Sequence, residues 1–203
     1  MPSLHDAPGL PGMPSLKDRF DAGLDFDAML GSATKNVELY RSFRSRAVAP
    51  AEFASRIATT GRRWHLLVIS EDWCGDSVNI VPWVDALSTS SSLTEMRIIG
   101  REDNLDLMDR HLTDGRSRAI PIVLLLDDAF VERGWWGPRP AELQAWFWSP
   151  DAQVLGKDAR YKELRLRYSR DRGRSIMEEL TLLIERAAVQ DASRDSATDI
   201  AAP

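Results

Sequence analysis

The only cysteine of this 203-residue chain, Cys74, lies in the run Glu71-Asp72-Trp73-Cys74-Gly75-Asp76-Ser77. A buried strand pattern precedes the run and a helical pattern follows it, so Cys74 is expected at a helix N-terminus. Unpaired backbone N–H groups and the positive end of the helix dipole favour a thiolate there. A thiolate is the nucleophile in exchange with disulfides. The run therefore predicts thiol chemistry at Cys74.

Acidic neighbours oppose this activation. Glu71, Asp72 and Asp76 place negative charge close to Cys74 and should raise the pKa of its thiol. A single cysteine is also often just a small buried apolar residue. The sequence leaves open whether the helix terminus or the acidic neighbours dominate.

Other kinds of reactive site find no support in the sequence. His65 and His111 have no metal-ligand spacing with each other or with Cys74, so no metal site is expected. There is no glycine-rich phosphate loop, no His-Glu-x-x-His and no Gly-x-Ser-x-Gly. We therefore expect no resident cofactor.

Net charge, the length of apolar stretches and the cysteine count argue against several classes of protein. The net charge of −5 gives no reason to expect nucleic acid or an anionic membrane as the main partner. No stretch approaches the roughly 18 apolar residues that span a bilayer, and the first residues lack the pattern of a secretory signal. A lone cysteine cannot form an internal disulfide. These features favour a cytoplasmic protein; the oligomeric state stays undetermined.

Strand and helix patterns alternate along the middle of the chain. Helical patterns cover 24–46, 51–60, 77–87, 105–112 and 140–146, and strand patterns cover 64–70, 96–100, 120–126 and 130–136. Alternation of this kind predicts an α/β domain around a central sheet. Two further helices, broken near Gly173, follow Pro150 and include the basic segment 157–174. Their apolar residues, among them Tyr161, Leu164 and Ile184, need cover and should fold back on the domain.

These patterns divide the chain into five segments. We expect a flexible N-terminus (1–15), a helical extension (16–50), an α/β domain (51–150), a basic helical extension (151–189) and a flexible tail (190–203).

Residues 51–148 resemble the thioredoxin family. Trp73-Cys74-Gly75-Asp76-Ser77 with Pro82 resembles the thioredoxin active-site helix, Trp-Cys-Gly-Pro-Cys with its later proline. The run Arg118-Ala119-Ile120-Pro121-Ile122-Val123-Leu124-Leu125 resembles the segment with the thioredoxin cis-proline. Phe130-Val131-Glu132-Arg133-Gly134 and Ala141-Glu142-Leu143 keep the order of the last strand and helix. The resemblance implies a three-layer thioredoxin-like fold, a central mixed sheet flanked by helices, within a bacterial group that has helical additions at both ends.

The chain departs from the family at two positions. Ser77 occupies the place of the second cysteine, and a hydroxyl cannot resolve a mixed disulfide. Val68 stands where thioredoxins have a buried Asp that assists proton transfer. Both departures fit a monothiol exchanger, and both also fit a site that has lost its activity.

The leading hypothesis is a monothiol thiol–disulfide exchange protein. Its catalytic residues would be Cys74 and Ser77, and its partner a protein or small-molecule disulfide or mixed disulfide. A low-molecular-weight thiol is the co-substrate that the missing second cysteine implies. The residues expected to bind substrate are Trp73, Gly75, Asp76, Ile120 and Pro121.

The alternative is a non-catalytic thioredoxin-fold module that binds a protein partner. It would use the groove at Pro121 and a group of tryptophans close to one another in the sequence. That group could equally belong to the core, and it comprises Trp135, Trp136, Trp146 and Trp148.

Overall fold

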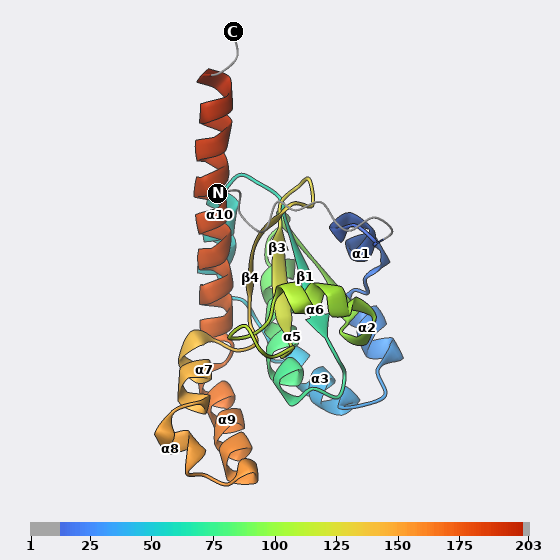
Figure 1. The fold of residues 1–203 in the computed structure, drawn as a ribbon, viewed down its shortest axis with the longest axis vertical. Helices are drawn as coiled ribbons and strands as arrows, with labels where there is room; N and C mark the ends of the chain where they lie inside the picture. The colour runs from blue at the N-terminus through green and yellow to red at the C-terminus, as the bar shows by residue number, and fades with distance from the viewer. Residues whose placement is uncertain (1–12, 201–203) are drawn as a thin grey trace.

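A mixed sheet of four strands lies between two layers of helices in the computed structural model, which describes residues 13–200 and the side chains of residues 13–193 (Figure 1). The strands are β1 (Trp64–Ser70), β2 (Thr94–Gly100), β3 (Ile122–Leu126) and β4 (Glu132–Trp136). They are ordered β2-β1-β3-β4, with β1 parallel to β2 and antiparallel to β3, and β3 antiparallel to β4.

Side chains of β1 alternate between two apolar cores. Leu66 and Val68 belong to one cluster, whereas Leu67 and Ile69 belong to the other. Since successive side chains of a strand point to opposite faces, the sheet is buried on both sides. The predicted three-layer α/β fold with a central mixed sheet is confirmed.

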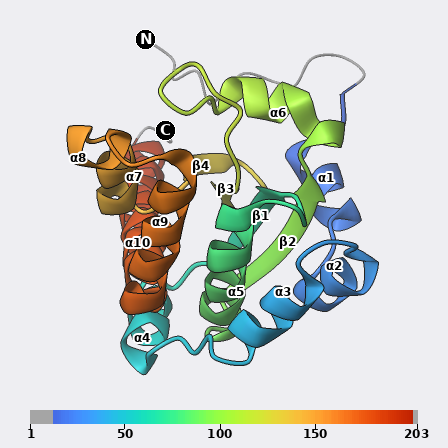
Figure 2. The ribbon, with the colours of Figure 1, turned by 90° about the horizontal axis from the view of Figure 1, so that it is seen from below.

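Different parts of the chain cover the two faces. One layer contains α3 (Val37–Arg44), α4 (Ala51–Thr59), α5 (Gly75–Thr89) and α10 (Arg174–Ile200). The other contains α1 (Leu16–Ala22) and α6 (Leu105–Arg110). Figure 2 shows α4 and α10 on one side of the sheet and α1 and α6 on the other.

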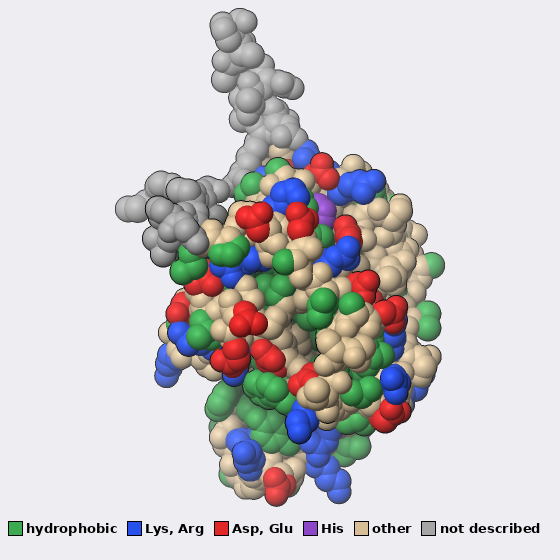
Figure 3. All heavy atoms as spheres, turned by 90° about the vertical axis from the view of Figure 1, so that its right-hand side faces the viewer, with side chains coloured by type: hydrophobic (Ala, Val, Ile, Leu, Met, Phe, Trp, Pro, Cys, Tyr) green, Lys and Arg blue, Asp and Glu red, His purple; other side chains and the backbone are tan. Residues whose placement is uncertain are grey.

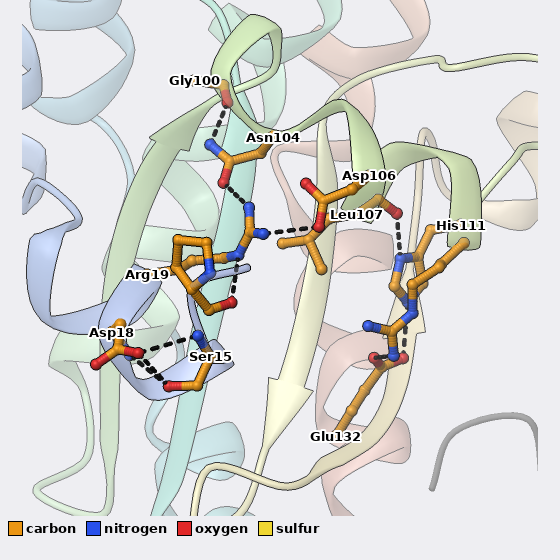
Figure 4. Close-up of polar contacts among 11 residues, drawn as sticks. Ser15, Asp18, Arg19, Gly100, Asn104, Asp106, Leu107, His111 and Glu132 are labelled. Carbon is orange, nitrogen blue, oxygen red and sulfur yellow. Dashed lines mark hydrogen bonds and ion pairs between the residues drawn. The ribbon is translucent and has the colours of Figure 1, made fainter. Parts of the chain in front are cut away.

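Buried polar contacts fix the second layer (Figure 4). Arg19 of α1 donates to the side chain of Asn104 in the short 3-10 helix η2 (Glu102–Asn104) and pairs with Asp106 of α6 at 2.7 Å. His111, just after α6, lies 2.7 Å from the carbonyl oxygen of Leu107 and 2.8 Å from the carboxylate of Glu132 in β4. These contacts join α1, α6 and β4 around the apolar core on that face.

The N-terminal extension differs from the helical pattern predicted for 24–46. Two helices, α2 (Phe26–Ser32) and α3, are separated by a loop in which Asn36 has a φ of 55°. The backbone N–H groups of Thr34 and Lys35 in this loop donate to the carboxylate of Asp72. The helical pattern is interrupted because these N–H groups bond to the segment before Cys74.

The C-terminal helices pack on the domain, as expected from their apolar residues. α7 (Ala141–Phe147), α8 (Pro150–Gln153) and α9 (Lys157–Asp171) precede α10, and the predicted break at Gly173 is confirmed. Leu164, Tyr168, Leu180 and Ile184 are buried in the same core as β1 and α5.

The tail expected from residue 190 is helical as far as the structure describes it, because α10 continues to Ile200. No glycine or proline interrupts residues 174–202, and alanine and arginine favour the helix. Asp191 is buried beside Arg133, with 3.3 Å between their polar atoms. The expected flexibility of residues 1–15 concerns positions that lie almost wholly outside the described residues, although Ser15 caps α1.

Candidate functional site

Cys74 is the N-cap residue of α5, and its thiol faces the loop that leads into β3. The thiol donates to the carbonyl oxygen of Ile120, with 3.4 Å between sulfur and oxygen. Only 8% of Cys74 is exposed. The helix terminus expected from the sequence is therefore present, and it is nearly closed to solvent.

The peptide bond between Ile120 and Pro121 is cis, as the resemblance implied. A second cis bond precedes Pro138, and Gly137 before it has a φ of 130°. A Cβ on Gly137 would stand 2.5 Å from the carbonyl oxygen of Pro121. Only glycine allows this approach, so Gly137 supports the loop beside Cys74.

The two acidic residues before Trp73 are bound to backbone N–H groups. Glu71 accepts from the N–H of Arg101 at 2.7 Å, and Asp72 accepts from Thr34 at 2.7 Å. Burial works against the charged form of Asp72, but the N–H donors of residues 34 and 35 hold its pKa below the usual value. Both carboxylates therefore anchor the loop before the cysteine.

Asp76 belongs to a buried polar group drawn from three elements. Arg139, in the loop before α7, donates to both carboxylate oxygens of Asp76, at 3.1 and 2.6 Å. The hydroxyl of Tyr168 in α9 donates to the same carboxylate at 2.9 Å. Although burial disfavours a charged guanidinium, Asp76 raises the pKa of Arg139. The second extension of the chain thus contacts the first turn of the active-site helix.

Burial dominates the state of the thiol. It raises the pKa of Cys74, and the charge of Asp76 acts in the same direction. The hydroxyl and the backbone N–H of Ser77 lower that pKa, but they do not outweigh burial. Burial, which the sequence pattern did not weigh, therefore acts in the same direction as the acidic neighbours and raises the pKa of the thiol.

Tyr40 of α3 is wholly buried, near enough to Cys74 for the two groups to influence each other. Burial raises the pKa of Tyr40, the charge of Cys74 adds to the effect, and the side chains of Ser70 and Ser77 oppose it. Ser77 is itself wholly buried. Each extension therefore supplies one tyrosine near Cys74: Tyr40 from the first and Tyr168 from the second.

The structure brings together all seven residues that the sequence proposed for the site. Cys74 to Ser77 form the start of α5, and the loop with Ile120 and Pro121 faces them. The side chain of Trp73 is 50% exposed, and the guanidinium of Arg101 lies 5.0 Å from the centre of its ring. Sequence reasoning missed Tyr40, Arg139, Tyr168 and Gly137. Tyr40 and Tyr168 were visible only as apolar positions of helical patterns.

The tryptophan group is divided between core and surface. Trp136 is buried and donates to Glu179 at 2.6 Å, whereas 59% of Trp148 is exposed. Trp135, Trp136 and Trp148 line an open groove of about 640 Å³ that also includes Arg139. The tryptophans therefore serve the core and also form a surface groove.

Two other kinds of feature were searched for. Within the described residues, no group of three or more His, Cys, Asp or Glu side chains is arranged to hold a metal ion. No helix in that part of the chain has the length and apolar character needed to cross a bilayer.

Known proteins share this architecture. A crystal structure at 1.5 Å of a protein of unknown function from Pseudomonas aeruginosa superposes with a TM-score of 0.67 and 26% identity, covering 86% of this chain and 99% of that one. The crystal structure of an HIV epitope-scaffold has a TM-score of 0.58 and 23% identity, over 87% and 96% of the two chains, and it shows the fold alone.

No curated protein matches the sequence. The model of the thioredoxin family matches residues 23–162, well over half of the length. The matched range includes the cysteine loop, the cis-proline loop and the four-stranded sheet. This chain therefore belongs to the thioredoxin family.

Proposed function

We propose that this protein exchanges thiols and disulfides through Cys74 alone, in a reducing compartment such as the cytoplasm. The observation that carries the proposal is the position of the Cys74 thiol, at the N-terminus of α5 and 3.4 Å from the Ile120 carbonyl oxygen beside Pro121. A thiolate formed there gains the unpaired N–H groups of the first helical turn. The main chain at Ile120 and Pro121 would hold an extended substrate, with Trp73 and Gly75 at its border.

The reaction has two steps. The Cys74 thiolate attacks one sulfur of a disulfide; a new S–S bond forms, the old one breaks, and the released thiolate takes a proton. An external low-molecular-weight thiol then attacks the mixed disulfide, and Cys74 leaves as a thiolate that is protonated again. Each cycle therefore exchanges one disulfide for another. If a second external thiol then attacks the new disulfide, the original disulfide is reduced overall to two thiols.

Ser77 gives this scheme its monothiol character. Its hydroxyl cannot displace a bound thiol, but it would stabilise a Cys74 thiolate, since it lowers the pKa of that thiol against the effect of burial. Asp76 is the other polar group of the first turn, and Arg139 and Tyr168 hold it in place. The proposed roles are therefore nucleophile for Cys74 and thiolate stabilisation for Ser77.

Mass spectrometry after treatment with oxidised glutathione tests the proposal. We expect a single glutathione adduct on the full chain, removed by free thiol and absent from Cys74→Ser. Ser77→Cys should convert the adduct into an internal disulfide, because a Cys-x-x-Cys across the first helical turn has suitable geometry. A reduced and folded chain that forms no adduct at pH 8.5 would contradict the proposal.

A second candidate is a non-catalytic module that binds a protein partner. It is favoured by the burial of Cys74 and by the raised pKa of its thiol. The groove beside Trp148 and the half-exposed Trp73 would then serve as the contact surface. A Cys74→Ser variant that keeps every biological activity of the chain would favour this second candidate.

A further inference from the structure

A small cleft of about 250 Å³ lies where α3, α5 and α9 meet, and it shares Tyr168 with the polar group around Asp76. It combines two arginines, three aromatic side chains and two further polar side chains. The lining residues are Phe43, Arg46, Asn79, Trp83, Tyr168, Ser169 and Arg172. No carboxylate is among them, although the chain as a whole has five more acidic than basic residues.

Arg46 is held in one orientation at the mouth of the cleft. Its Nε donates to the carbonyl oxygen of Ser42 at 2.9 Å, and one terminal nitrogen lies 3.1 Å from the Ser42 hydroxyl. The guanidinium lies 5.0 Å from the ring centre of Phe43. Among residues 13–193, no acidic side chain pairs with it. Its remaining N–H donors are therefore available to a ligand.

Arg172 is fixed by the junction between α9 and α10. Its φ is 53°, and its N–H donates to the carbonyl oxygen of Tyr168 at 3.0 Å. The next residue, Gly173, lies so close to Trp83 that a Cβ would be 2.1 Å from the ring. Because the backbone packs against Trp83, the backbone position of Arg172 relative to α5 is set, and its exposed side chain lines the cleft. Within the described side chains this arginine, too, has no acidic partner.

Several arginines near the cleft do have acidic partners. Arg167 and Arg170 on the same helix both contact Glu163, at 3.1 and 3.9 Å. Arg174, two residues after Arg172, pairs with Glu52 at 2.9 Å. By contrast, neither Arg46 nor Arg172 is paired with an acidic side chain among the described residues, and both are exposed at the cleft. Figure 3 shows Lys, Arg and apolar side chains at the lower end of the view, which is the end where Figure 1 places α8 and α9.

We propose that this cleft binds the phosphate group of a small anionic ligand. Two guanidinium groups match the charge of a phosphate dianion, and each can donate two N–H bonds to its oxygens. The rings of Phe43 and Trp83 provide an apolar wall, and the cleft is larger than inorganic phosphate requires. A phosphate ester with a flat apolar body therefore fits better than the free ion.

Calorimetric titration of the full chain tests this, with NaCl keeping the ionic strength constant. The probes are inorganic phosphate, phenyl phosphate and sodium acetate. We expect saturable binding of the two phosphates with little binding of acetate, and tighter binding of phenyl phosphate than of inorganic phosphate. Inorganic phosphate binding as tightly as its ester would still support a phosphate site but assign it to the free ion.

Matched variants separate a built site from general positive charge. Arg46→Gln and Arg172→Gln should each weaken phenyl phosphate binding by about tenfold or more. Arg165→Gln removes the same charge from an exposed position of α9 outside the cleft, and it should change binding less than about twofold. Thermal melting by circular dichroism checks that each variant is folded.

Two results would overturn the proposal. One is the absence of saturable binding of either phosphate up to about 10 mM, well above the concentration at which two guanidinium contacts should act. The other is an equal loss of binding in Arg165→Gln and Arg172→Gln. Because none of these measurements involves the thiol, the result is independent of the chemistry proposed for Cys74.

Discussion

The hydroxyl of Tyr168 donates a 2.9 Å hydrogen bond to the carboxylate of Asp76, two residues after the cysteine. Tyr168 lies in α9, beyond the segment that first suggested the family, yet it is buried against the first turn of α5. Burial raises the pKa of Tyr168 far above its ordinary value, and the charge of Asp76 raises it further. The tyrosine is therefore a neutral donor, and the C-terminal extension is part of the site.

Tyr168→Phe should lower the free energy of unfolding by about 1.5–3 kcal/mol, because a buried carboxylate loses one of its donors. Urea denaturation followed by circular dichroism measures this change. Tyr161→Phe is the matched control on the same helix, since no hydrogen bond of the Tyr161 hydroxyl is found among the described residues. Its stability should change by less than about 0.5 kcal/mol. Equal effects of both variants would show that the bond to Asp76 contributes nothing measurable.

Gly137→Ala should destabilise the protein by about 1–3 kcal/mol, because the new Cβ meets the carbonyl oxygen of Pro121 and the φ of 130° disfavours any other residue. Displacement of the Pro121 loop should also change the alkylation rate of Cys74, measured with iodoacetamide. Gly31→Ala is the control, because a Cβ at this position in α2 meets no atom within 4 Å. That variant should be as stable as the parent or slightly more so. A stable Gly137→Ala with the parent alkylation rate would contradict the role given to Gly137.

Alkylation of Cys74 should be slower at pH 7 than that of a free-cysteine peptide. The thiolate reacts, and burial raises the pKa of Cys74, so less thiolate is present at that pH. The rate should rise with pH and level off only above the pKa of an ordinary cysteine.

Ser77→Ala removes a hydroxyl that lowers the pKa of Cys74, so the rise of the Cys74 alkylation rate with pH should move to still higher pH. Ser90→Ala, at the far end of the same helix, is the control and should leave the profile in place. If the alkylation rate of Cys74 levels off at a lower pH than that of the free-cysteine peptide, the thiolate is activated and the effect ascribed to burial is contradicted.

Leu164→Ala should lower the free energy of unfolding by about 2–5 kcal/mol, because this side chain of α9 is only 2% exposed in the main core. Leu166→Ala makes the same change two residues away, at a position 44% exposed, and should cost less than about 0.5 kcal/mol. Thermal and urea denaturation of both variants measure the difference. Similar melting of the two would mean that α9 is an appendage with no part in the core.

The sequence by itself determined the elements whose signals are local. The apolar run of β1 is long and bounded, so its buried position between two layers followed from the pattern of residues 64–70. The cysteine at the start of α5 followed from the local change from a strand pattern to a helical one, and the cis bond at Pro121 was implied by the resemblance to the thioredoxin family. The break between α9 and α10 followed from Gly173, since glycine favours the end of a helix.

Only the tertiary structure decided which distant side chains surround Cys74. Tyr40 and Tyr168 occupy apolar positions of two helices separated by more than a hundred residues, and periodicity cannot say which of them meets the active-site helix. The raised pKa of Cys74 likewise depends on how much protein covers the thiol, and Glu71 and Asp72 near it in sequence turned out to bind backbone N–H groups. Polar composition likewise did not show that Asp191, in the expected tail, is buried beside Arg133. Packing brings these groups together, and desolvation then sets the charge that each can hold.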